Sequence, residues 1–97
     1  MPTLFILSHA PHRDPLDHRT LGFARPGDSV ILIEDSVYAA GSTPTPLSGP
    51  LAEAQAKGVF VAALQADLEA RGVKTSLPVV DYAGFVDLIA AHERSVH

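Results

Sequence analysis

Three acidic residues stand where apolar runs of this sequence end, a position from which carboxylates are able to do acid/base chemistry. Glu34 and Asp35 follow the run Ser29–Ile33, and Asp81 closes the run Leu77–Asp81. Open α/β sheets bind their ligands at the carboxyl ends of strands, so one hypothesis places a pocket around these acids. The other is that Asp35 and Asp81 cap the helices that follow, by accepting hydrogen bonds from exposed N–H groups. Adjacent strand residues point to opposite sides, which argues against an acid/base pair and favours capping.

Two aromatic residues accompany these acids. Tyr38 shares a short, weakly charged segment with Ala39 and Ala40. Core packing is the simpler interpretation of that segment, and a protein–protein surface, where aromatics are enriched and charges depleted, is the alternative. The residues that we assign to a candidate pocket or interface are Glu34, Asp35, Tyr38, Asp81 and Tyr82.

Other reactive side chains lack the partners that their chemistry requires. His9, His12 and His18 are close in sequence, but a metal site needs three or four converging ligands at defined spacing. Ser8 and Ser36 have none of the flanking glycines of a nucleophile elbow, which favours turn and cap roles. The chain has no cysteine, and its glycines form no phosphate-binding loop. We therefore expect no catalytic residue, no metal and no cofactor in this chain.

Apolar runs alternate with helical patterns along the chain. The strands and helices that they predict must position the candidate residues named above. The predicted strands are Thr3–Ser8, Ser29–Ile33, Val59–Leu64 and Leu77–Asp81. The predicted helices begin at Pro15, Glu34, Leu51, Gln65 and Tyr82, and a proline-rich loop occupies Ser42–Pro50. Runs that are apolar throughout are typical of a parallel sheet covered on both sides. Strand–helix alternation with short connections then predicts one α/β domain over residues 1–97, a parallel sheet with flavodoxin-like helix layers on both faces.

Two details refine this expectation. Pro78 cannot donate a hydrogen bond to a neighbouring strand. The strand that contains it should therefore lie at an edge of the sheet, or have Pro78 as its first residue. The last helix carries Phe85, Leu88, Ile89 and His92 on one stripe.

Composition excludes several classes of protein. The 97 residues include 46% hydrophobic and 19% charged residues, which is typical of a globular domain with room for a buried interface. The formal charge is −4 and the seven basic residues form no cluster in the sequence, which argues against direct nucleic-acid binding. We expect no signal peptide, because no charged segment precedes a long apolar run, and no apolar run reaches the roughly 20 residues that cross a bilayer. A cytoplasmic protein without membrane contact is the expectation.

Three blocks, ILIEDSVYAAG, VFVAALQADLEARGV and VVDYAGFVDL, resemble the TusB/DsrH family in order and spacing, and LFILSHAP is similar to the opening strand of that family. The resemblance covers nearly the whole chain and implies the DsrE/DsrH-like fold. It also implies a subunit of a cytoplasmic sulfur relay. Such subunits assemble with TusC/DsrF-like and TusD/DsrE-like partners into a dimer of heterotrimers. The TusBCD branch serves tRNA wobble uridine thiolation, the DsrEFH branch serves sulfur oxidation, and the main sulfur-carrying cysteine belongs to the TusD/DsrE-like subunit.

The chain departs from the sulfur-oxidising branch at one position. DsrH-type members carry a cysteine ahead of an apolar–x–Phe–Ala stretch, and alignment on LGFA puts Thr20 in its place. A threonine hydroxyl does not form a persulfide. The leading hypothesis is therefore a non-catalytic subunit of a sulfurtransferase complex. The alternatives are a stand-alone small-molecule-binding α/β module near the strand-end acids and a homo-oligomeric DsrH-like protein.

Overall fold

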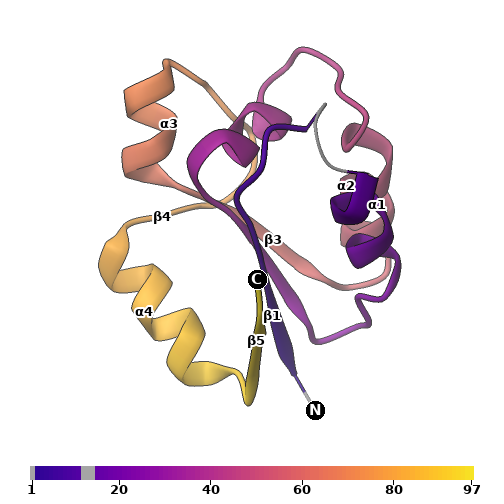
Figure 1. Cartoon of the computed structure of the whole chain (residues 1–97). Coiled ribbons are helices and arrows are strands. Elements are labelled where there is room, and N and C mark those ends of the chain that lie inside the picture. Colours follow the sequence, from indigo (N-terminus) through magenta and orange to yellow (C-terminus); the bar gives the residue numbers. More distant parts are fainter. Residues whose placement is uncertain (1, 12–14) are drawn as a thin grey trace.

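The computed structural model describes residues 2–11 and 15–97, with the backbone alone for residues 15–18 (Figure 1). The strands are β1 (Thr3–Leu7), β2 (Ser29–Leu32), β3 (Phe60–Leu64), β4 (Val79–Val80) and β5 (Arg94–Val96). The helices are α1 (Pro15–Gly22), the 3-10 helix η1 (Glu34–Ala40), α2 (Ser48–Ala56), α3 (Gln65–Arg71) and α4 (Tyr82–Ala91). In this part of the chain no helix is long and apolar enough to span a bilayer.

The strands form a parallel sheet in the order β4-β3-β2-β1-β5, which confirms the predicted α/β architecture. The short strand that follows Pro78 lies at one edge, as proline requires. The other edge strand, β5, was not predicted, because three residues with an arginine and a serine give no apolar run. It forms because α4 returns the chain to β1, where Arg94 pairs with Thr3 and Val96 with Phe5.

The beginning of α2 also differs from the prediction. The helix starts at Ser48 rather than Leu51, so the proline-rich loop is shorter than expected. Pro50 lies in the first turn, where a missing N–H costs no intrahelical hydrogen bond. The turn before it is fixed by Ser48, whose Oγ accepts from the Thr45 N–H at 2.9 Å.

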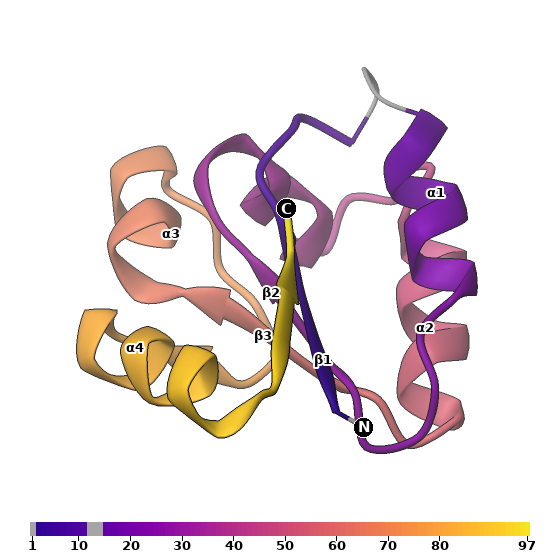
Figure 2. The same ribbon diagram turned by 60° about the horizontal axis from the view of Figure 1, so that its bottom comes forward.

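The larger core lies between the sheet and the pair α1 and α2, which cover one face (Figure 2). Alternate residues of the central strands enter it, including Val30, Leu32, Val61 and Ala63. Leu21 of α1 and Leu51 and Ala54 of α2 close it from the other side. The opposite face carries Leu4, Ile31, Ala62 and Leu64, all buried, and α4 lies on that side of the sheet (Figure 2).

Helix α4 rests on the sheet through only part of its apolar surface. Of the residues on the predicted stripe, Phe85, Leu88 and His92 are half-buried, whereas Ile89 is 43% exposed. The imidazole of His92 anchors the helix end, with Nδ1 2.6 Å from the Leu88 carbonyl oxygen and Nε2 2.9 Å from the Ser29 hydroxyl. The helix contains no fully buried residue.

Asp81 caps α4, which confirms one of the two predicted caps. Its Oδ1 accepts a hydrogen bond from the Gly84 N–H at 2.8 Å. The carboxylate satisfies a helix-start donor and also lies at the positive end of the helix dipole.

Substitution of this cap should therefore weaken the fold measurably. We expect Asp81→Ala to lower the free energy of unfolding by about 1 kcal/mol in urea titrations, since the Gly84 N–H loses its acceptor. The matched control is Asp87→Ala on the exposed face of the same helix, which removes an equal charge and should change stability by less than about 0.5 kcal/mol. Equal losses in the two variants would mean that charge, not capping, is the cause.

Asp28 is the buried carboxylate of the fold, with 7% of its surface exposed. Its Oδ1 accepts from the Thr3 N–H and its Oδ2 from the Arg25 N–H, each at 2.9 Å. One side chain therefore fixes both the beginning of β1 and the turn between α1 and β2.

Candidate functional site

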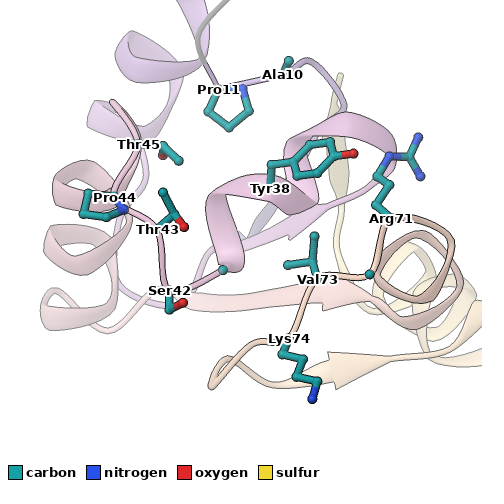
Figure 3. Close-up of a pocket in the computed structure, with 12 residues that line it drawn as sticks. Ala10, Pro11, Tyr38, Ser42, Thr43, Pro44, Thr45, Arg71, Val73 and Lys74 are labelled. Atoms are coloured by element: carbon teal, nitrogen blue, oxygen red, sulfur yellow. The ribbon is translucent and has the colours of Figure 1, made fainter.

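A cavity of about 640 Å³ opens at the carboxyl end of the sheet, where an open α/β sheet is expected to bind a ligand (Figure 3). Four segments form it: the loop after β1, η1 with the segment that follows it, the end of α3, and the segment after α3. Its lining residues are Ala10, Pro11, Tyr38, Gly41, Ser42, Thr43, Pro44, Thr45, Arg71, Gly72, Val73 and Lys74.

Helix η1 presents Tyr38 to this cavity because its other side is held in the core. Ser36 is fully buried, and its Oγ lies 2.8 Å from the Ile33 carbonyl oxygen and also contacts the Leu7 carbonyl. Val37 is fully buried beside it. Tyr38 itself is 46% exposed, so core packing is the wrong interpretation for this residue. In Figure 3 its ring lies across the opening, with the hydroxyl toward Arg71.

Of the two acids at the end of β2, Asp35 is ion-paired, whereas Glu34 takes part through its backbone N–H and is not among the residues that line the cavity. Asp35 Oδ1 accepts from Arg71 Nε at 2.9 Å, and Asp67 Oδ1 lies 3.4 Å from Arg71 Nη1. Asp67 Oδ2 also accepts from the Glu34 N–H at 2.7 Å. Hydrogen bonding to Asp35 raises the pKa of Arg71 above its ordinary value, with further support from the charge of Asp67, so the guanidinium stays protonated. The cluster is a structural ion-pair network.

The prediction that Asp35 caps the helix after β2 is therefore wrong. The N-cap residue of η1 is Ile33, which has no side-chain acceptor. The chain enters η1 through Glu34 at φ 48°, a left-handed conformation. That entry turns the first free N–H toward α3, and Asp67, distant in sequence, supplies the acceptor instead of Asp35.

The structure brings together only part of the predicted candidate set. Tyr38 lines the cavity, and Asp35 adjoins it through Arg71. Asp81 and Tyr82 are not among the lining residues: Asp81 caps α4, and Tyr82 is 62% exposed at the start of that helix.

Several residues that line the cavity are not among the site residues predicted from the sequence. Arg71 and Lys74 come from α3 and the segment after it, which carry no motif, and Val73 follows the glycine that ends α3. The hydroxyl-rich stretch 42–45 belongs to the segment that the sequence predicts as a proline-rich loop. Its density of serine, threonine and proline directly after a strand–helix unit was the signal available for the site.

The lining suits binding better than covalent chemistry. It offers neutral hydroxyls, proline rings, one aromatic ring, one paired guanidinium and one amine. The whole chain lacks a thiol. In Figure 3 the Lys74 ammonium points away from the opening, so the cavity itself is weakly charged.

The histidines do not supply a metal site within the described residues, among which no three metal-binding side chains converge. His9 is exposed on the loop after β1. His12 and the side chain of His18 lie outside the described residues. Thr20 is half-buried on α1 and is not among the residues that line the carboxyl-end cavity.

Comparison with known proteins identifies the family. The family model for DsrH like protein matches residues 9–95. In fold the chain is similar to protein Tm0979 from Thermotoga maritima, solved by solution NMR, with a TM-score of 0.66, 21% sequence identity and 94% of each chain covered. No curated protein matches the chain. Because the family model spans almost the full length, the chain belongs to the DsrH-like family, which supports its involvement in a sulfur relay that normally works as a multi-subunit complex.

Proposed function

We propose that this chain is a non-catalytic subunit of a sulfurtransferase complex of the TusBCD/DsrEFH type. One observation carries the proposal: the family model spans residues 9–95, yet the chain contains no cysteine to hold a persulfide. Thr20 occupies the position of the DsrH-type cysteine and offers only a hydroxyl. The sulfur-carrying cysteine then belongs to a TusD/DsrE-like partner, and this chain shapes and stabilises the complex.

The finer role that we propose is support of 2-thiouridine formation at the tRNA wobble position or of sulfur oxidation, in the cytoplasm. The whole of residues 1–97 acts as one domain in this proposal. Its partners are one TusC/DsrF-like and one TusD/DsrE-like subunit, arranged as a dimer of heterotrimers without direct contact of this chain to nucleic acid.

An exposed apolar surface supports such an assembly. It consists of Val79 on β4 and Tyr82, Val86 and Ile89 on α4, each between 43% and 62% exposed, and we call it the α4 stripe. Asp87 is the charged residue within α4. Tyr82, Val86 and Ile89 recur at helical spacing on one face of α4, and an apolar face with so little charge is typical of a surface that a partner subunit covers.

Native mass spectrometry of the chain, alone and co-expressed with the two sister subunits, tests the proposal. We expect a species with two copies of each subunit, and persulfide label on the sister cysteine alone after incubation with a sulfur donor. The chain expressed alone is the control and should carry no sulfur. Persulfide transfer by this chain in isolation, or a stable monomer that ignores both sisters, would contradict the proposal.

The carboxyl-end cavity favours a second candidate, a stand-alone module that binds a small molecule. Its volume of about 640 Å³ lies within the range of ligand sites. A monomer that fails to assemble with the sisters, and whose Tyr38 and Val73 resonances shift saturably with one metabolite, would favour this candidate. The third alternative, a homo-oligomer, predicts self-association through the α4 stripe.

A further inference from the structure

A second opening lies at the amino end of the sheet, on the side away from the carboxyl-end cavity. Its volume is about 480 Å³. Its lining residues are Thr3, Phe5, Phe23, Arg25, Asp28, Arg94 and Val96. They come from the beginning of β1, the turn between α1 and β2, and the edge strand β5, which are far apart in the sequence.

Two arginines of this pocket, Arg25 and Arg94, lack a direct ion-pair partner among the described residues. Within residues 2–11 and 15–97, neither the Arg25 nor the Arg94 guanidinium makes an ion pair or hydrogen bond, whereas Arg71 is held by two carboxylates. Asp28 also lines the pocket, and its two oxygens accept backbone N–H groups, so the lining carries two guanidinium charges against one carboxylate charge. The tertiary structure has thus placed two free cations at one site of a chain whose net charge is −4.

Apart from Thr3, the rest of the lining is apolar. Phe23 is 74% exposed, more than any other large hydrophobic side chain in the described part of the chain. Phe5 and Val96 form the floor toward the core. An exposed aromatic ring beside arginines matches the residue types that dominate binding energy in protein interfaces.

We propose that this pocket binds a short acidic segment of a partner polypeptide. An apolar side chain of that segment packs on Phe23 and Val96, and carboxylates on either side of it pair with Arg25 and Arg94. Carboxylates match the planar fork of a guanidinium in bidentate geometry, which adds direction as well as affinity. The inference does not depend on a role in sulfur transfer.

Charge and size favour a peptide over a nucleic acid. Electrostatic affinity for a phosphate backbone grows with the number of phosphates neutralised, and two arginines supply few such contacts. Glu93 precedes Arg94, and the overall charge of −4 repels a polyanion further. A pocket of about 480 Å³ accommodates one or two side chains and not a folded surface.

The test is fluorescence polarisation at low ionic strength with a labelled peptide of sequence GDLFDG, in which two aspartates flank an apolar pair. We expect saturable binding to the full chain, and roughly hundredfold weaker binding of the matched GNLFNG peptide, because a charge-assisted hydrogen bond is lost at both arginines. Arg25→Gln and Arg94→Gln should each weaken binding of GDLFDG about tenfold, and Phe23→Ser should weaken it similarly. Arg19→Gln, an exposed arginine of α1 outside the pocket, removes the same charge and should bind as the unaltered chain does.

An amide NMR spectrum of each variant checks that the variant is folded. We expect the fold to be intact, because the side chains of Phe23 and both arginines are exposed. Peptide-induced shifts at residues 23–25 and 94–96 would support the site. Absence of saturable binding, equal affinity for GNLFNG, or an equal effect of Arg19→Gln would overturn it. Competition by oligouridine as strong as by the unlabelled peptide would also overturn it and assign the pocket to nucleic acid.

Discussion

Replacement of Asp28 by asparagine is expected to lower the free energy of unfolding by about 2–4 kcal/mol. The carboxylate accepts from the Thr3 and Arg25 N–H groups at once, so an amide in its place must point an NH₂ group at one of these donors. One hydrogen bond is lost, and a donor is left without an acceptor in a site where Asp28 is only 7% exposed. A loss of this size is a large share of the 5–15 kcal/mol that small domains have.

Urea and thermal unfolding of Asp28→Asn measure the effect. The control, Asp87→Asn, makes the same chemical change on an exposed position of α4 and should move stability by less than about 0.5 kcal/mol. If Asp28→Asn were as stable as this control, the two hydrogen bonds of the Asp28 carboxylate would contribute nothing to the free energy of unfolding, contrary to the prediction.

The second large effect concerns assembly. Val86→Asp should weaken association with the sister subunits about a hundredfold or more, because it places a charge at the centre of the α4 stripe, where a partner would have to desolvate it. Val86 is 62% exposed in the isolated chain, so the same substitution should leave the unfolding free energy of that chain nearly unchanged.

Co-purification followed by native mass spectrometry gives the result. Ala56→Asp is the matched control, since it places a new carboxylate at an exposed position of α2, on the opposite side of the sheet from α4 (Figure 2). Full assembly of Val86→Asp would show that the sisters bind elsewhere, and equal loss in both variants would point to net charge rather than to the stripe.

The two strand-end caps show how far local sequence reasoning reaches. Asp81 caps α4 through an N–H three residues ahead, a contact that lies within one turn and so follows from residue type and position. Asp35 has the same local sequence setting but pairs with Arg71, and Asp67 takes its place at the Glu34 N–H. No local signal separates these two outcomes, because the deciding partner comes from another helix.

The sequence by itself determined the elements of the parallel sheet that carry apolar runs, the restriction of Pro78 to an edge strand or to the first position of a strand, and the absence of a thiol. These properties depend on period, residue type and composition, all of which are local. Only the tertiary structure decided that β5 completes the sheet, that Tyr38 opens onto a cavity, and that Arg25, Arg94 and Phe23 line one pocket. Each depends on contacts between distant segments, whose free energy comes from the packing of the whole fold and leaves no periodic trace in either segment alone.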